Sequence, residues 1–410
     1  MGQVEAALKA MPVVVLTGAR QTGKTTLTSL LAGQRRYYTL DDYEILDQAA
    51  RAPDALLAEL PVTLDEVQRA PGILLAVKRV VDTRRVVGSV LLTGSANLLL
   101  SHKISESLAG RAVYIELQPC CPCEWLGRIA QLDRLTDLFR NDLRASDWPE
   151  ESGEWREWLL SGGYPPVLSM EPDSGRDFWF RGYVQTFVER DLRALSEISN
   201  LADFQKLMKL VANQAGRLIN QANLARDSAL SHATAHRYLN LLETACLLVR
   251  LPAFTTGITG QVVKSPRWFW TDCGLAAYLA GIRDPSTLAA RPDSGAWLEQ
   301  TLFQTFQLWR ALDPVRRKLY YWRDPSGREV DLILEQDEAL VAIEIKQSNH
   351  VGVDDARGIQ AFKQMLGRRR DHLIRGVVLH AGQPRQLDSD ILALPFGWMT
   401  PATGSKIDHG

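Results

Sequence analysis

The stretch that decides the fold runs from Val13 to Thr25 and reads VVVLTGARQTGKT in this chain of 410 residues. Its first five residues form a β-branched run typical of a buried strand. Residues 18–25 match the pattern G-x-x-x-x-G-K-[S/T], in which glycines let backbone N–H groups surround phosphate oxygens. A helix expected to begin at Lys24 directs its positive N-terminal end toward the same site. The sequence therefore predicts a phosphate-binding loop between a strand and a helix.

This loop is expected to bind ATP, because the spacing places Lys24 against the β and γ phosphates. The Thr25 hydroxyl is expected to ligate Mg²⁺. Ser95 or Asn97, just after an apolar run, is expected to sense the γ-phosphate; a simple turn at the end of a strand is the alternative. The residues expected to bind the nucleotide are Gly18, Ala19, Arg20, Gln21, Thr22, Gly23, Lys24, Thr25, Thr26, Ser95 and Asn97.

A second apolar run ends in two carboxylates, Asp65 and Glu66, forty residues after the loop. We expect Asp65 to hold Mg²⁺ and Glu66 to orient and polarise the attacking water. An apolar run followed by two acidic residues is common at protein surfaces. After a phosphate-binding loop, however, it indicates nucleotide hydrolysis.

Residues 1–118 alternate short apolar runs with helical patterns, which is typical of a mostly parallel α/β sheet. The expected fold class is therefore α/β, with a P-loop NTPase domain at the N-terminus. The expected strands are Val13–Thr17, Tyr37–Leu40, Pro61–Leu64, Val90–Thr93 and Val113–Leu117, and the expected helices include Lys24–Leu31 and Ile73–Val81.

Three further parts are expected. Residues 119–200 have the aromatic, helical pattern of a connector or lid. Residues 201–284 contain two helices and two short strands, which predict a winged-helix-like unit whose second helix presents Ser231, His232, Thr234, Arg237 and Asn240 outward. Residues 285–410 combine the helix Ala296–Leu312 with the strands Val330–Leu334, Leu340–Ile345 and Gly376–Leu379.

The last part carries Asp331 and, thirteen residues later, Glu344-Ile345-Lys346. Strand alternation places Glu344 and Lys346 on one face, and Glu299 lies on the preceding helix. This is the layout of a PD-(D/E)XK phosphodiesterase core, in which Glu299, Asp331 and Glu344 would bind Mg²⁺ or Mn²⁺ and Lys346 would assist catalysis. Gln360 follows on the next predicted helix. The alternative is a sheet edge with paired charges.

The chain resembles the bacterial and archaeal AAA-type ATPases that have a C-terminal domain of uncharacterised function. The motifs that carry the resemblance are residues 17–25, 64–68, 92–95, 108–111, 162–165, 189–191 and 272–275. The resemblance implies a nuclease-like fold for the C-terminal domain and an arginine finger at Arg111, which would act in a homo-oligomer if it works in trans. A surface role is the alternative for Arg111.

Lys and Arg total 47 against 48 Asp and Glu, so a nucleic-acid partner would need a local basic surface. No apolar stretch predicts a membrane span, no secretion signal is evident, and Cys120, Cys121 and Cys123 have poor spacing for a metal site. We therefore expect a cytoplasmic ATPase coupled to DNA binding or processing. The alternative is a nucleotide-dependent switch that binds a protein partner and has an inert C-terminal domain.

Overall fold

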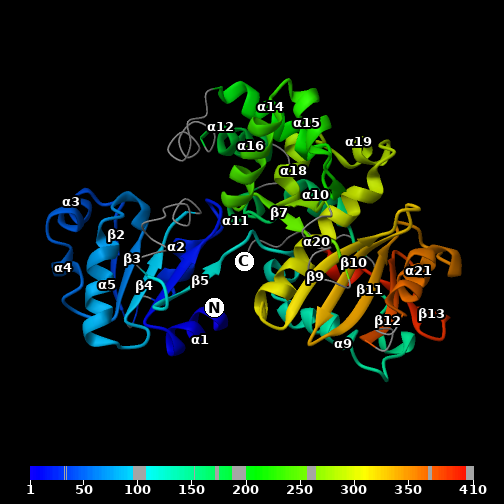
Figure 1. Ribbon diagram of the computed structural model, residues 1–410, viewed down its shortest axis with the longest axis horizontal. Helices are drawn as coiled ribbons and strands as arrows, with labels where there is room; N and C mark the ends of the chain where they lie inside the picture. The colour runs from blue at the N-terminus through cyan, green and yellow to red at the C-terminus, as the bar shows by residue number, and fades with distance from the viewer. Residues whose placement is uncertain are drawn as a thin grey trace. The chain divides into compact units, whose positions relative to one another are not determined.

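The computed structural model describes residues 1–31, 33, 35–95, 108–151, 153–170, 175–186, 200–255, 265–367 and 372–402 (Figure 1). The chain forms two compact units. The first comprises Met1–Pro119, Gln185–Ser199 and Leu239–Leu247, and the second comprises Cys120–Val184, Asn200–Tyr238 and Leu248–Gly410. Asn97 and the motif at residues 189–191 lie outside the described residues.

A five-stranded parallel sheet forms the centre of the first unit, in the order β2-β3-β4-β1-β5. The expected strands are all present within one residue at each end. Their bounds are β1 Val13–Thr17, β2 Arg36–Thr39, β3 Val62–Asp65, β4 Val90–Thr93 and β5 Ala112–Glu116. β1, β3 and β4 are completely buried, which explains their continuous apolar sequence.

Helices cover both faces of this sheet. Val13 and Val15 face a core formed with α3 Tyr43–Arg51, α4 Pro53–Leu56 and α5 Ile73–Arg84. The alternate residues of β1 face α1 Gly2–Ala10 and α2 Lys24–Ser29. α1 was not expected from the sequence, and it covers the apolar side chains on that face.

The second unit begins with short helices that include α8 Pro122–Trp125, α9 Asp133–Asp137, α10 Trp155–Ser161, α11 Pro165–Leu168 and α12 Arg176–Thr186. They agree with the expected helical connector. The short 3-10 helices η3 Ile129–Leu132 and η4 Ala145–Asp147 lie between α8 and α10. Cys121 and Cys123 are buried here, and burial raises the pKa of the Cys120 thiol to about 12.

The next segment contains three helices and a small antiparallel sheet of order β6-β8-β7. Its elements follow the order α14 Leu201–Ala212, β6 Arg217–Leu218, α15 Gln221–Ser228, α16 His232–Thr244, β7 Leu248–Leu251 and β8 Arg267–Trp270. α18 Cys273–Leu279 and α19 Pro285–Ala289 then lead to the last segment. The two expected helices and two expected strands are therefore present, with α14 and β6 in addition.

The last segment is built on a six-stranded mixed sheet of order β13-β14-β12-β11-β10-β9. Its elements are α20 Ser294–Leu312, β9 Arg317–Arg323, β10 Glu329–Gln336, β11 Ala339–Ile345, α21 Arg357–Leu366, β12 Leu373–His380, β13 Arg385–Asp388 and β14 Ile391–Pro395. β9, β10 and β11 are antiparallel neighbours, whereas β12 runs parallel to both β11 and β14. α21 packs over β10 and β11, and α20 contacts β9 and β11.

Within the ranges described above, no helix combines the length and the apolar content needed to cross a lipid bilayer.

Candidate functional site

The loop between β1 and α2 has the backbone conformation that phosphate binding requires. Gly18 has φ 139° and Gly23 has φ 90°, values in the region that favours glycine. A Cβ atom on Gly18 would overlap the carbonyl oxygen of Leu117 at the end of β5. The glycines predicted from the sequence are therefore needed for the loop to turn beside the neighbouring strand.

Lys24 is buried at the first position of α2 and bends back over the loop. Its Nζ donates to the carbonyl oxygens of Gly18 at 3.2 Å and Ala19 at 2.6 Å. Burial lowers the pKa of Lys24, and the nearby Glu66 carboxylate opposes that shift. The ammonium group is thus held beside the backbone N–H groups of the same loop.

Asp65 ends β3 beside the loop and accepts hydrogen bonds from three hydroxyl groups. The Thr25 hydroxyl donates to Oδ2 at 3.1 Å and the Tyr37 hydroxyl to the same oxygen at 2.7 Å, while the Thr93 hydroxyl donates to Oδ1. Burial and the bond to Asp65 raise the pKa of Tyr37, which keeps its phenol protonated as a donor. The sequence predicted Thr25 and Asp65 as a pair but missed Tyr37 and Thr93.

Glu66 follows in the left-handed conformation, with φ 59°, which is unusual for a residue that is not glycine. Its N–H donates to the Thr93 hydroxyl at 3.3 Å, and its carboxylate accepts from the Gln68 amide. These contacts turn the Glu66 side chain toward the same cavity as Lys24. Such an outlier is typical of functional sites.

Lys24, Thr25 and Glu66 line a cavity of about 420 Å³. Ser95 lines it and is only 5% exposed, yet its hydroxyl has no hydrogen-bond partner among the described residues. The residues lining the cavity are Arg20, Gln21, Gly23, Lys24, Thr25, Thr26, Asp41, Glu66, Gln68, Arg69 and Ser95. A buried hydroxyl without a partner, an ammonium group and a Thr–Asp pair suit a magnesium-bound nucleotide, which needs few protein ligands.

Arg111 does not join this site within its own chain. Arg111 precedes β5, and the strand register pairs Ala112 with Val13 at the start of β1. The loop follows the end of β1, so Arg111 lies at the opposite end of the strands from the loop. Its guanidinium group bonds the Asp82 carboxylate, with Nη2 to Oδ2 at 3.0 Å, and the Ala109 carbonyl oxygen. An arginine-finger role would therefore have to be exerted on another chain.

The predicted C-terminal residues also come together. Asp331 on β10 and Glu344 on β11 are buried, and Lys346 Nζ lies 3.0 Å from Glu344 Oε2. Asp331 Oδ2 accepts the N–H of Ile345 at 2.9 Å. With Glu299 from α20 they line a cavity of about 310 Å³. Burial raises the pKa of Glu344, and Asp331 adds to the effect.

Arg267, on β8, neutralises two of these carboxylates and was missed from the sequence. Its guanidinium group bonds Glu299 and lies 3.5 Å from Asp331 Oδ1, and it also donates to the Gly216 carbonyl oxygen at 2.8 Å. Burial raises the pKa of Glu299 to about 7, although Arg267 lowers it. A guanidinium group therefore takes the oxygens that a metal would need.

The structure places Glu299, Asp331 and Glu344 around one cavity, and the metal that they are expected to hold stays a prediction. In the described part of the chain, no group of three or more His, Cys, Asp or Glu side chains is placed to hold a metal ion. The sequence pattern gave the right cluster but not its counter-ion, because Arg267 comes from a strand 64 residues before Asp331.

Comparison with known proteins assigns each segment. Residues 10–126 match the AAA domain family, residues 152–286 match a domain of unknown function (DUF8612), and residues 294–399 match a second domain of unknown function (DUF4143). Residues 10–126 therefore form an AAA domain, and the phosphate-binding loop lies within it.

Uncharacterized proteins of Mycobacterium tuberculosis and Mycobacterium bovis are each 31% identical over 394 residues, covering 95% of this chain and 81% of theirs. The chain belongs to the family of these mycobacterial proteins. An uncharacterized Haemophilus influenzae protein is 23% identical over 227 residues, covering 53% of this chain and 52% of its own. Among solved structures, a Walker-type ATPase of Pyrococcus abyssi matches 68% of this chain and 93% of its own, at 15% identity and a TM-score of 0.41.

Proposed function

We propose that the protein binds ATP with Mg²⁺ in its first unit and hydrolyses it. The observation that carries this proposal is the hydrogen-bonded group of Thr25, Asp65 and Thr93, which lies beside Lys24 and Glu66. It joins the loop to the ends of two neighbouring strands, and Lys24, Thr25 and Glu66 line one cavity.

The residues have separate tasks in this reaction. Lys24 and the loop N–H groups bind the phosphates, and Thr25 with Asp65 would hold Mg²⁺, which neutralises charge on the transferring phosphoryl group. Glu66 orients a water molecule and polarises it for in-line attack. Ser95, whose buried hydroxyl needs a partner, contacts the γ-phosphate.

Steady-state ATP hydrolysis and nucleotide binding test this proposal. Lys24→Ala should abolish tight ATP binding. Glu66→Gln should keep binding but lower kcat by about 10²-fold or more, the usual range for loss of a general base. Lys9→Ala, an exposed charge removal on α1, is the matched control. Wild type without magnesium-dependent hydrolysis, or a Glu66→Gln chain with normal kcat, contradicts the proposal.

We further propose that the second unit contacts DNA under control of the ATPase. We also propose that the chain has four domains, at residues 1–118, 119–200, 201–284 and 285–410. The order helix, strand, helix, helix, strand, strand from α14 to β8 supports a winged helix. Ser231 just before α16, and His232 and Arg237 in its first half, are exposed, where a recognition helix contacts DNA. The order α20-β9-β10-β11-α21-β12 supports a PD-(D/E)XK-like fold for the last domain.

Because Arg267 pairs with two of the acidic side chains, the last domain is better suited to DNA binding than to DNA cleavage. An inert domain also suits the second candidate function, a nucleotide-dependent switch with a protein partner. Salt-dependent DNA binding separates the two, because phosphate contacts give a steep loss of affinity with salt. A cleavage assay with Mg²⁺ or Mn²⁺ on single- and double-stranded DNA, comparing wild type with Lys346→Ala, tests the nuclease activity. Cleavage by wild type that Lys346→Ala abolishes would show an active nuclease.

A further inference from the structure

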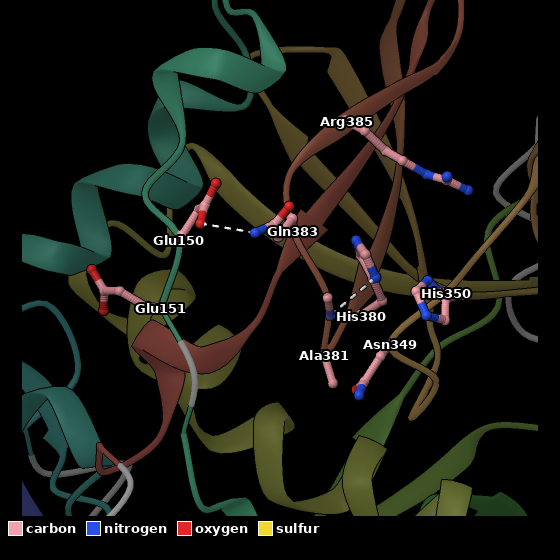
Figure 2. Close-up of a pocket in the computed structure, with 9 residues that line it drawn as sticks. Glu150, Glu151, Asn349, His350, His380, Ala381, Gln383 and Arg385 are labelled. Carbon is pink, nitrogen blue, oxygen red and sulfur yellow. Dashed lines mark hydrogen bonds between the residues drawn. The ribbon is translucent and has the colours of Figure 1, made fainter.

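A third cavity, of about 550 Å³, lies at the carboxyl ends of the parallel strands β11 and β12 (Figure 2). Ligands of open α/β sheets are usually bound at this edge. The cavity is lined by Glu150, Glu151, Asn349, His350, His380, Ala381, Gly382, Gln383 and Arg385. It is distinct from the acidic cluster, with which it shares none of its lining residues.

The two loops that form the cavity are fixed to one another. The N–H of Ala381 donates to the Ser348 carbonyl oxygen at 3.1 Å, and the N–H of Lys346 donates to the Leu379 carbonyl oxygen at 2.8 Å. A Cβ atom on Gly382 would overlap the Asn349 carbonyl oxygen, so glycine permits this close approach. The site is therefore largely preformed.

His380 places a buried donor in this cavity. The residue is 1% exposed, and its Nδ1 accepts the N–H of Gly382 at 3.2 Å. The ring proton is then on Nε2, which is buried and has no hydrogen-bond partner among the described residues. Burial lowers the pKa of His380, although backbone groups of Gln383 and Asn349 oppose this shift. The Gly382 contact leaves Nε2 as the donor of the neutral ring. Because a buried donor without an acceptor is costly, the site calls for a ligand oxygen here.

The charged groups of the cavity are separated. Figure 2 shows Glu150 and Glu151 on the connector segment at one side, and His350, His380 and Arg385 on the C-terminal segment at the other. Glu151 pairs with Arg134 at 2.8 Å, whereas Glu150 accepts the Gln383 amide at 3.1 Å. One side of the cavity thus suits an oxyanion, and the other suits hydroxyl or amino groups.

We propose that this cavity binds a nucleoside monophosphate, with its phosphate at Arg385, His350 and His380 and its sugar or base at Glu150 and Gln383. A phosphate offers several acceptor oxygens, and arginine is suited to phosphate recognition. The volume lies in the ordinary range for small-molecule sites. This site is separate from the P-loop and does not depend on ATP hydrolysis.

Isothermal titration of the full chain carrying Lys24→Ala, which disables the P-loop, tests the proposal. AMP, GMP, CMP, UMP and inorganic phosphate are the probes, with a short 5′-phosphorylated oligonucleotide to distinguish free from polymer-borne nucleotide. At least one monophosphate should bind with a dissociation constant of roughly 10 µM to 1 mM. Arg385→Ala and His380→Phe should each weaken it by about 10-fold or more.

Arg316→Ala is the matched control, because this exposed arginine pairs with Asp337 away from the cavity, and binding should be unchanged. Arg385 is exposed, so its variant tests the site even if His380→Phe fails to fold. Absence of binding by every nucleotide, binding indifferent to Arg385→Ala, or phosphate alone binding as tightly as the best nucleotide would overturn the proposal.

Discussion

Three hydroxyl groups donate to the carboxylate of Asp65, and two of them come from neighbouring strands. Tyr37 has the longest side chain of the three donors, and its hydroxyl bonds the same Asp65 oxygen as the Thr25 hydroxyl. In the proposed reaction it therefore positions the carboxylate that would hold Mg²⁺. Tyr37→Phe removes this bond and keeps the ring.

We expect Tyr37→Phe to raise the Mg²⁺ concentration needed for half-maximal hydrolysis and to lower kcat by about 10-fold, since hydrogen bonds to charged groups are worth about 1.5–3 kcal/mol. ATP hydrolysis measured against Mg²⁺ concentration checks this. Tyr43→Phe, on the exposed surface of α3, is the control. An unchanged Mg²⁺ dependence would mean that Thr25 and Thr93 position Asp65 without help.

Arg267 is the counter-ion of a buried acidic cluster, so its removal leaves Glu299 and Asp331 unpaired. Arg267→Met should lower the free energy of unfolding of the second unit by about 3–5 kcal/mol, measured by denaturant unfolding. Adding Glu299→Gln should recover part of this loss, because one buried charge is then gone. Arg316→Met, a surface pair, should change stability by less than about 1 kcal/mol. Equal stability of the Arg267→Met chain would show that the carboxylates are already protonated.

Local patterns in the sequence were sufficient to predict that Lys24, Thr25, Asp65 and Glu66 lie at one site, because each polar residue directly follows an apolar strand or belongs to the loop motif. Tyr37 and Arg267 had no such signal. Tyr37 meets Asp65 through the pairing of β2 with β3, and Arg267 meets Glu299 across 32 residues. Contacts that depend on strand register and on packing between segments cannot be predicted from the spacing of residues along the chain.

At the scale of elements, two separate sequence motifs prove to be one structural contact. Asp272 caps the start of α18 by accepting the N–H of Leu275 at 2.6 Å, and it accepts the N–H of Gly163 at 2.6 Å. A Cβ atom on Gly274 would come within 2.7 Å of Gly162 N. These residues join the turn between α10 and α11 to α18, so their role here is structural.

Asp272 is also the basis of a pH prediction. Burial raises its pKa to about 6 from 3.8, although hydrogen bonds from backbone N–H groups lower it. A raised folded-state pKa means that the stabilising contribution is complete below about pH 4 and is lost as pH rises through 6. A shift of about two units corresponds to ~3 kcal/mol. Thermal unfolding should therefore show wild type losing stability relative to Asp272→Asn between pH 4.5 and 7.5.

The exposed cap Asp284 is the control for this series, since hydrogen bonds from Ser286 and Thr287 lower its pKa to about 2. Its stabilising contribution is lost only as pH falls through 2, so Asp284→Asn should keep a constant difference from wild type between pH 4.5 and 7.5. If the stability of Asp272→Asn changed with pH in parallel with that of wild type, the prediction that the buried Asp272 carboxyl titrates near pH 6 would be wrong.

Strand prediction succeeded for the whole first sheet, whereas β9, β13 and β14 of the last sheet were not predicted. β1 and β4 begin and end where their apolar runs do, because every residue in them is buried. β13 was not predicted, and its sequence Arg-Gln-Leu-Asp explains this: it is an edge strand with mostly exposed polar side chains. Pairing with β14, which is buried throughout, makes it a strand.

At the scale of the whole molecule, Arg111 bears on assembly. Because Arg111 lies at the end of the strands opposite its own phosphate site, a catalytic role for it requires a second copy of the chain.

Mixing Lys24→Ala chains with Arg111→Ala chains distinguishes a finger in trans from a surface role. In a homo-oligomer with a finger in trans, an intact site in the Arg111→Ala chain receives Arg111 from the Lys24→Ala chain. Hydrolysis by the mixture should then exceed the sum of the separate variants by about 10-fold or more, given the 10³–10⁵-fold effect of an arginine finger. Lys24→Ala mixed with Glu66→Gln is the control, since neither chain has an intact site and no recovery is expected. Normal hydrolysis by Arg111→Ala alone would instead assign Arg111 to the surface pair that it forms with Asp82.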